Sequence, residues 1–213
     1  QTTLAAYGGS RDMSEFDRWE GRFDAEEYVF GTAANHFLSQ QAKHLVAGAK
    51  AISIADGEGR NGVWLAEQGL QVTAQDFSPT AQNKARKLAQ TRGVDLTFEL
   101  SDLTKRRWEP DTYDVVVGIF FQFLSPVDRA TAFRGICDTL KPGGLLLIEG
   151  YGPKQLEYGT GGPKILENLY TEDMLREAFD VFTDLSVIAY DEEVSEGAGH
   201  HGLSALVDVI GRK

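Results

Sequence analysis

A chain of 213 residues with 42% apolar and 25% charged side chains suits one globular α/β domain with a sizeable core. Its formal net charge of −11 argues against a nucleic-acid partner, because binding to phosphate backbones depends mainly on Lys and Arg. No apolar run approaches the ~20 residues that a membrane-spanning helix needs, and the single cysteine, Cys137, excludes an internal disulfide. A cytoplasmic protein with neither a membrane nor a nucleic acid as partner is predicted.

The first part of the chain divides near Met13, which resembles a start of translation. Residues 1–13 are therefore expected to be an N-terminal extension, either native or added, and residues 14–213 a single domain. Aromatic and apolar residues at near-helical spacing run through 14–48 and predict two helices. These helices either pack on a sheet as core or form a lid over a ligand. The lid would bring four residues near that ligand: Trp19, Arg22, Tyr28 and Gly31.

From residue 51 onward, strand and helix patterns alternate. An apolar run over 51–54 is followed by two glycines one residue apart and then by helical spacing, which is typical of a strand turning sharply into a helix. Ser78-Pro79 and Ser125-Pro126 each begin a helix, with Ser as N-cap and Pro at the first helical position. Four further runs are apolar or alternate as strands do: 70–75, 94–100, 115–121 and 145–148.

The tail of the chain departs from this alternation. A Gly-rich loop over 150–163 and a helix beginning at Thr171 lead to two strands, about 182–190 and 203–210, with no helical pattern between them. These strands are predicted to form an antiparallel hairpin joined by a loop over 191–202. The predicted fold is α/β: a doubly wound, mostly parallel, seven-stranded, Rossmann-like sheet with a C-terminal antiparallel hairpin and an N-terminal helical lid.

Three aspartates follow successive predicted strands: Asp56, Asp76 and Asp102. Because open parallel sheets bind ligands at the carboxyl ends of their strands, these side chains are expected at one edge of the sheet. Asp76 comes about 20 residues after the Gly-rich turn, where a carboxylate can accept hydrogen bonds from ribose hydroxyls. Asp102 is placed to accept from an exocyclic adenine amine. One Asp in a turn is ordinary, but three in phase with the strands favour a nucleotide-like ligand.

The spacing of Gly57, Gly59 and Gly62 also fits the dinucleotide fingerprint, which leaves a nicotinamide-dependent oxidoreductase as an alternative. That fingerprint is weak by itself. The long segment ahead of the motif and the hairpin at the end of the chain give no support to this class of enzyme.

Taken together, residues 16–212 resemble the class I S-adenosylmethionine (SAM)-dependent methyltransferases. Asp56-Gly57-Glu58-Gly59 is similar to the family's first motif, with Ser53 at the position of an acidic residue and Ala55 at that of the first glycine. Asp76-Phe77-Ser78-Pro79 is similar to the ribose-binding segment and Ser101-Asp102-Leu103 to the adenine-binding segment. The run from Leu140 to Gly144 is similar to the turn before strand five.

The run from Gly57 to Asn61 narrows the resemblance to the tellurite-resistance and thiol-methyltransferase-like branch of small-molecule methyltransferases. Upstream, Trp19, Arg22-Phe23, Tyr28, Gly31 and the run 35–38 also resemble that branch, although Ala34 stands where the branch often has Pro. The resemblance implies SAM as the cofactor and S-adenosylhomocysteine (SAH) as the product. It implies these cofactor contacts: Tyr28, Gly31, Ala55, Asp56, Gly57, Glu58, Gly59, Arg60, Asn61, Asp76, Phe77, Ser78, Asp102, Leu103, Gly118, Ile119 and Phe120.

The implied reaction is an in-line displacement of the methyl group by a nucleophile on a small acceptor, such as a thiol or a chalcogen. No catalytic residue is assigned, and the candidates for a base or a substrate contact are Tyr151, His200 and His201. A thiolate, chalcogen or halide needs no general base, whereas a hydroxyl acceptor usually does.

The two histidines have other interpretations as well. They are equally consistent with exposed loop residues, and with Glu193 or Glu196 they are too few and too loosely spaced to predict a metal site. The alternative to an enzyme is a non-catalytic relative that binds SAM or SAH as a sensor. A monomer or a weak homodimer is expected.

Overall fold

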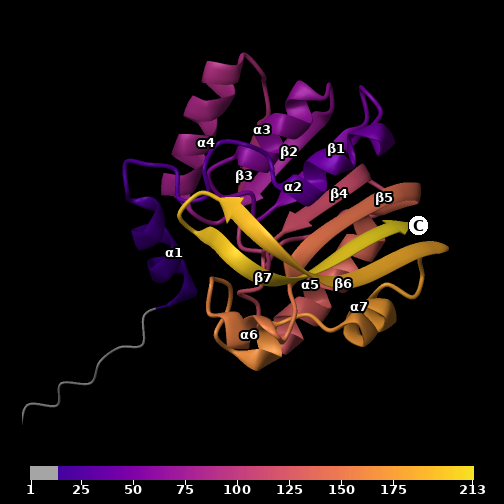
Figure 1. Ribbon diagram of the computed structural model, residues 1–213. Helices are drawn as coiled ribbons and strands as arrows, with labels where there is room; N and C mark the ends of the chain where they lie inside the picture. Colours follow the sequence, from indigo (N-terminus) through magenta and orange to yellow (C-terminus); the bar gives the residue numbers. More distant parts are fainter. Residues whose placement is uncertain (1–13) are drawn as a thin grey trace, which may run out of the picture.

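One seven-stranded sheet organises the chain, with the strand order β3-β2-β1-β4-β5-β7-β6 (Figure 1). The computed structural model describes residues 14–213, and the expected extension, residues 1–13, lies outside them. The strands are β1 (Lys50–Ile54), β2 (Gln71–Asp76), β3 (Thr97–Leu100), β4 (Tyr113–Ile119), β5 (Leu140–Tyr151), β6 (Asp184–Glu196) and β7 (His200–Arg212).

The sheet is mixed. Neighbouring strands from β3 to β5 pair in parallel, whereas β7 runs antiparallel to both β5 and β6. The predicted Rossmann-like α/β sheet with an antiparallel C-terminal hairpin is therefore confirmed. Within residues 14–213, every helix is too short or too polar to cross a membrane.

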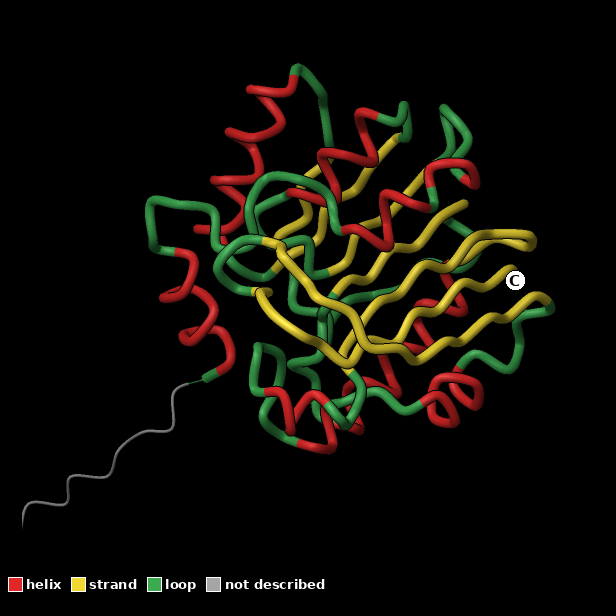
Figure 2. The backbone as a smooth tube through the Cα atoms, in the orientation of Figure 1, coloured by secondary structure: helices red, strands yellow, loops and turns green. Residues whose placement is uncertain are grey.

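Helices cover both faces of the sheet (Figure 2). The α-helices are α1 (Glu15–Phe23), α2 (His36–Gln40), α3 (Arg60–Glu67), α4 (Pro79–Arg92), α5 (Pro126–Thr139), α6 (Gln155–Tyr158) and α7 (Glu172–Ala178). Two 3₁₀ turns, η1 (Ala42–His44) and η2 (Leu166–Asn168), lie between them. As predicted, the Ser78, Ser125 and Thr171 side chains cap α4, α5 and α7 by accepting from a backbone amide in the first turn.

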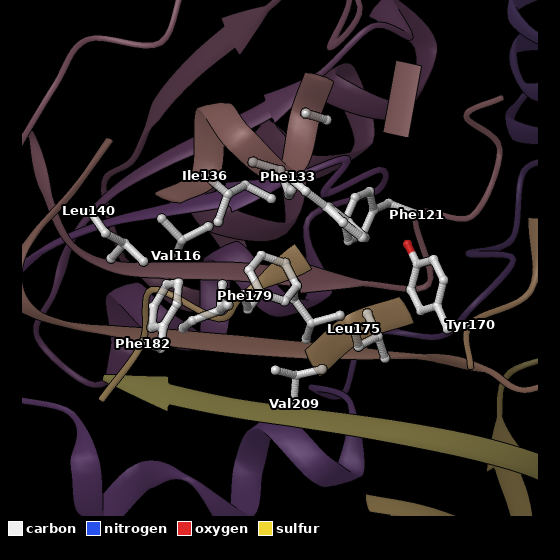
Figure 3. Close-up of a cluster of buried hydrophobic side chains, with 14 of the residues drawn as sticks. Val116, Phe121, Phe133, Ile136, Leu140, Tyr170, Leu175, Phe179, Phe182 and Val209 are labelled. Atoms are coloured by element: carbon white, nitrogen blue, oxygen red, sulfur yellow. The ribbon is translucent and has the colours of Figure 1, made fainter. Parts of the chain in front are cut away.

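The core consists of two layers because the parallel strands are buried on both faces. In one layer, Phe133 of α5 and Phe179, the C-cap of α7, pack on β4, β5 and β7, as Figure 3 shows for the cluster around Val116. In the other layer, Leu38 of α2 and Leu65 of α3 pack on the opposite side of the same strands. This packing fixes the carboxyl ends of β1, β2, β4 and β5 along one edge.

Three predicted segments differ in the structure. Residues 36–48 form the short α2 and η1 rather than one long helix, because Leu45 turns extended so that the chain can enter β1. The connection from β3 to β4 contains no helix. The hairpin strands are longer than predicted, so that residues 197–199 alone lie between β6 and β7.

The long hairpin has a physical reason at its tip. Figure 1 shows the tip reaching the segment that follows α1, where the amide of Gly199 donates to the carbonyl of Val29 (3.0 Å). Cross-strand pairing continues to Glu196 and His200. The predicted loop over 191–202 is therefore wrong for most of its length, and His200 and His201 lie on β7.

Candidate active site

A cavity of about 130 Å³ lies at the carboxyl ends of β1, β2, β4 and β5, the edge at which open α/β sheets bind ligands. Helix α1, Phe30 after it, the loop at Gly162 and Pro163, and the hairpin tip also contribute to its wall. Among the sequence-predicted site residues, these line it: Ala55, Asp56, Gly57, Arg60, Asn61, Asp76, Phe77, Ile119, Phe120, Tyr151 and His200. Four residues of α1 also line the cavity: Arg18, Trp19, Arg22 and Phe23.

The turn after β1 brings the backbone close to other groups. A Cβ atom on Gly59 would lie 2.6 Å from the Cβ atom of Ala85, so this glycine allows α3 to approach α4. A Cβ atom on Gly62 would lie 2.5 Å from the Oδ2 atom of Asp56. The third glycine of the motif thus leaves room for a carboxylate rather than for a pyrophosphate.

Asp56 is the buried carboxylate of this turn. Its Oδ1 atom accepts hydrogen bonds from the Ser53 hydroxyl (2.6 Å) and the Gly62 amide (2.9 Å). Its Oδ2 atom is buried and has no hydrogen-bond partner among residues 14–213. Burial raises the pKa of Asp56 to about 6, and the Ser53 and Gly62 hydrogen bonds oppose that rise. A free, buried acceptor in a cavity wall suits a ligand that carries an ammonium group.

Asp76 ends β2 and is also buried. Its two oxygens accept from the Gly57 amide and the Ser78 amide, both at 2.8 Å. Burial raises its pKa to about 6, and these backbone hydrogen bonds oppose that rise. Because each carboxylate oxygen has a second lone pair, Asp76 can still accept from hydroxyl groups in the cavity.

Gln75 is a site-forming residue that the sequence analysis missed. Its buried side chain accepts from the Ala55 amide (2.9 Å) and donates to the Ser101 carbonyl (2.6 Å). It therefore ties the ends of β1, β2 and β3 together. A polar residue at the buried end of a predicted strand is the signal that could have identified it.

Several predicted cofactor contacts do not line the cavity. They are Tyr28, Gly31, Glu58, Gly59, Ser78, Asp102, Leu103 and Gly118, together with the candidate base His201. The Glu58 carboxylate accepts from the Val29 amide (2.8 Å) and forms a buried ion pair with Lys84 (2.7 Å). Tyr28 donates to the carbonyl of Lys84. Glu58 and Tyr28 thus fasten the segment after α1 to α4.

The remaining predicted contacts have other surroundings. The Asp102 side chain is 40% exposed and accepts from the amide and the hydroxyl of Thr104. Leu103 is buried in the core, and a Cβ atom on Gly118 would lie 2.6 Å from the ring of Phe121. His201 is exposed, since successive residues of a strand face opposite sides. Among the residues that the structure describes, no three His, Cys, Asp or Glu side chains gather to hold a metal ion.

Tyr151 and His200 form a pair in the cavity wall, from the end of β5 and the start of β7. The Tyr151 hydroxyl oxygen and the His200 Nδ1 atom are 2.5 Å apart. The His200 ring stacks on Phe30, with centroids 4.5 Å apart, and packs against Phe120 at 4.2 Å. Burial, with Arg60 and Arg22 nearby, lowers the pKa of His200 to about 3. Burial raises the pKa of Tyr151, so both groups are neutral at pH 7.

Asn35 joins the walls of the cavity. Its side-chain amide donates to Glu149 (2.5 Å) and to Glu196 (3.1 Å), and its backbone amide donates to Asn61 (2.9 Å). Glu196 also forms a buried ion pair with Arg60 (2.7 Å). Asn35 also caps α2, since its Oδ1 atom accepts from the amide of Leu38. Its contacts with β5 and β6 carry no local sequence signal.

Comparison with known proteins gives a family for this arrangement. Residues 51–144 match the family described as methyltransferase domain. The matched part, which runs from β1 into β5, is similar to a methyltransferase domain. The ubiquinone/menaquinone biosynthesis C-methyltransferase UbiE of Neisseria meningitidis serogroup C is 31% identical over 116 residues, which are 53% of this chain and 46% of that protein. The chain matches less than half the length of each curated relative considered.

Solved structures agree with the fold. The structure of TehB from Haemophilus influenzae has a TM-score of 0.67 at 18% identity, covering 93% of this chain and 66% of that one. A structure concerned with the conversion of a disulfide bond into a thioacetal group during echinomycin biosynthesis has a TM-score of 0.74 at 16% identity, covering 94% and 93%. The predicted resemblance to SAM-dependent methyltransferases is confirmed at the level of domain and fold.

The residues present fit the cofactor that this family implies. The unpartnered Asp56 Oδ2 atom offers an acceptor to the ammonium group of SAM. Asp76 offers carboxylate oxygens to its ribose hydroxyls, at the strand end where such contacts are made. The expected cofactor, SAM, is therefore consistent with both the family and the cavity.

Proposed function

We propose that this protein is a SAM-dependent methyltransferase that acts on a small-molecule acceptor, a thiol, a chalcogen or a similar nucleophile. The observation that carries the proposal is a single cavity that combines the Asp56 and Asp76 carboxylates with the neutral Tyr151–His200 pair. When bound, SAM supplies a methyl group on a positively charged sulfur, and transfer to a thiolate leaves SAH with no proton to remove.

Two carboxylates hold the donor in this proposal. Asp56 accepts from its ammonium group and Asp76 from its ribose hydroxyls, and both are ionised above pH 6 because their pKa values are about 6. Asp102 remains the proposed adenine contact, and because Thr104 donates only to its Oδ1 atom, its Oδ2 atom would accept from the adenine amine. The backbone around Gly57 and the residues from Gly118 to Phe120 complete the proposed donor site.

The acceptor side supports a nucleophile that arrives already ionised. A general base works best when its pKa is near the working pH. The pKa of His200 is about 3, and the pKa of Tyr151 lies above its ordinary range, so neither takes up a proton from an acceptor at pH 7. Thiols form thiolates in water far more readily than alcohols form alkoxides, since a free thiol has a pKa of about 8.5. The pair therefore favours a thiol or chalcogen over a hydroxyl acceptor.

The chain's own contribution to the rate is alignment and exclusion of water. Holding two reactants in a near-attack arrangement is worth roughly 7–11 kcal/mol of barrier. The aromatic rings of Phe30, Phe120 and Tyr151 line this part of the cavity and keep water out. We propose that α1 and the segment after it act as the lid, since α1 contributes four residues to the cavity wall.

We make three further proposals, on the class of acceptor, the location of the protein and its oligomeric state. The net charge of −11 supports a small-molecule acceptor rather than a nucleic acid. We also propose a cytoplasmic location without a membrane partner. The protein is proposed to be a monomer or a weak homodimer.

Calorimetry and product analysis test the proposal. SAM should bind saturably and NAD should not, and Asp76→Ala should abolish SAM binding while the exposed Asp95→Ala variant leaves it unchanged. Labelled SAM should then give methylated product with thiols in a panel of thiols, phenols and amines. SAM binding without turnover on any acceptor would support a non-catalytic sensor instead, and binding of NAD alone would support an oxidoreductase.

A further inference from the structure

Two residues of helix α1 line the cavity and carry hydrogen-bond donors that have no acceptor in the described part of the chain. Trp19 and Arg22 are three residues apart, which places them on one face of the helix, and both line the cavity. The Nε1 atom of Trp19 is buried and has no acceptor among residues 14–213. The Arg22 Cζ atom lies 5.1 Å from the ring centroid of Trp19 and 4.9 Å from that of Phe30.

Arg22 differs from the other arginines of the cavity in having no carboxylate partner within the described part of the chain. Arg18 pairs with Glu15 (2.8 Å) and Arg60 with Glu196 (2.7 Å). Glu58 is close enough to act on the pKa of Arg22, but its carboxylate is already paired with Lys84. The guanidinium of Arg22 is therefore available to a ligand.

Arg22 lies on the side of the cavity where the methyl acceptor is proposed to bind, close to Gly199 and His200. A Cβ atom on Gly199 would lie 3.0 Å from the Arg22 Nη2 atom, so the guanidinium sits beside the residue that precedes His200. Arg22 also lowers the pKa of His200. The Asp56 and Asp76 carboxylates come from the turn after β1 and the end of β2 instead. Basic donors and acidic acceptors thus come from different walls of one cavity.

We infer that Trp19 and Arg22 form an anion subsite, and that the methyl acceptor is a thiol-type small molecule that also carries a carboxylate. A guanidinium binds a carboxylate through two parallel hydrogen bonds, and an indole N–H donates a third. The aromatic side chains of Phe30 and Phe120 in the cavity wall favour an apolar body for this acceptor. This inference rests on the proposed function, because it names the second functional group of the acceptor at the same site.

The carboxylate of SAM has the same chemistry, so the test separates the two sources. The probes are 4-mercaptobenzoate and the uncharged, nearly isosteric 4-mercaptobenzamide, titrated by calorimetry into the full chain saturated with SAH. We expect the benzoate to bind at least about tenfold more tightly than the benzamide, since charge-assisted pairs are the strong ones. This ratio should fall to near one in Arg22→Gln and to an intermediate value in Arg22→Lys.

Two further variants complete the design. Trp19→Phe keeps an aromatic ring and removes the N–H, and should weaken benzoate binding more than benzamide binding because the charged acceptor makes the stronger hydrogen bond. Arg134→Gln removes an equal charge from an exposed site on α5 and should behave as the unmodified protein does. SAM affinity, measured separately, should stay within about twofold in Arg22→Gln.

Each contrary outcome has a definite meaning. If Arg22→Gln weakens SAM tenfold, the subsite holds the donor's carboxylate and the inference is overturned. An unchanged benzoate-to-benzamide ratio in Arg22→Gln, or no binding of either probe, overturns it as well. If the binding pattern holds but neither probe is ever methylated, the inference stands as a binding statement and the proposed transferase activity fails.

Discussion

The Ser53 hydroxyl donates a hydrogen bond of 2.6 Å to the Oδ1 atom of Asp56. Ser53 stands where the resemblance to class I methyltransferases implies an acidic residue, and the carboxylate of Asp56, three residues further along, accepts from that serine. The other oxygen, Oδ2, has no hydrogen-bond partner among residues 14–213. The turn remains an acidic site even though its sequence departs from the family's pattern.

SAM affinity should depend on pH through Asp56 and Asp76. Because burial raises both pKa values to about 6, the ionised forms that bind the donor are lost as pH falls below about 6. We expect the Kd for SAM to rise steeply from pH 7 to pH 5, and Asp56→Asn to weaken SAM at pH 7 by about tenfold with a shallower pH dependence. Calorimetry from pH 5 to pH 8 measures both effects. An Asp56→Asn protein with unchanged affinity would show that the backbone of the turn suffices.

Lower pH, which weakens SAM binding, should stabilise the folded protein in the absence of SAM through the same two carboxyl groups. A carboxylate whose pKa is higher in the folded state than in the unfolded chain contributes stability below its unfolded pKa, and that contribution disappears as pH rises through the folded value. Without ligand, Asp56 and Asp76 should therefore favour folding less at pH 7 than at pH 4. The Asp56→Asn variant should lose part of this pH dependence in denaturant unfolding, because its amide does not ionise.

Gly59→Ala should destabilise the fold more than Gly93→Ala does. Both glycines have positive φ, 92° and 68°, so each variant suffers backbone strain of about 1–2 kcal/mol. A Cβ atom on Gly59 would also lie 2.6 Å from the Cβ atom of Ala85, whereas one on Gly93 meets nothing within 4 Å. Overpacking adds about 1–3 kcal/mol. Urea unfolding of the two variants measures the difference, and equal destabilisation would mean that α3 can move away from α4 freely.

Asn35→Ala should destabilise the fold at a pH above the raised pKa of Glu149, and less so at pH 5. The variant removes the donor to Glu149, a carboxyl whose pKa burial and the neighbouring Asp208 and Glu196 raise well above its ordinary range. Glu149 Oε1 still accepts from Tyr190 (3.4 Å), but its buried Oε2 atom loses its donor, which costs about 1–3 kcal/mol and more when the group is charged. Protonation at low pH relieves that cost, since a neutral carboxyl tolerates burial better. Chemical unfolding at the two pH values tests this, with Asn168→Ala, at the end of η2, as a control.

Much of the fold could be predicted because its signals are local. Ser78-Pro79 and Ser125-Pro126 begin helices by capping chemistry alone, and the apolar run over Val115–Val117 requires burial on both faces of a sheet. The hairpin was predicted too short because its outer half is stabilised by contact with Phe30 and Gly31, which are distant in sequence. A pattern read within one segment contains no information about that contact.

Some residues of the candidate site could also be predicted from local sequence signals, whereas others could not. Residues that end strands, such as Asp56 and Asp76, could be found because topology brings strand ends together. Gln75, Asn35 and the position of His200 could not, because each depends on pairs of elements whose packing is set by the whole chain. Tyr28 and Glu58 were predicted to hold the cofactor, but their side chains fasten the segment after α1 to α4 instead of lining the cavity.

Replacing His200 should show whether this residue aligns the acceptor or takes a proton from it. Loss of a general base typically costs 10²–10⁴-fold in rate, on the order of 3–5 kcal/mol of barrier. His200 has a pKa of about 3, so we expect His200→Gln to lower kcat/KM for a thiol acceptor by no more than about tenfold, through poorer packing against Phe30 and Phe120. The pH profile should follow the ionisation of the thiol: kcat/KM should rise at lower pH for an acidic thiol than for a basic one, in the unmodified protein and in the variant alike.

Tyr151→Phe, which removes the hydroxyl that meets the His200 Nδ1 atom, should behave similarly. A loss of a thousandfold in either variant, or a pH profile that stays fixed when the thiol is changed, would identify the Tyr151–His200 pair as the base.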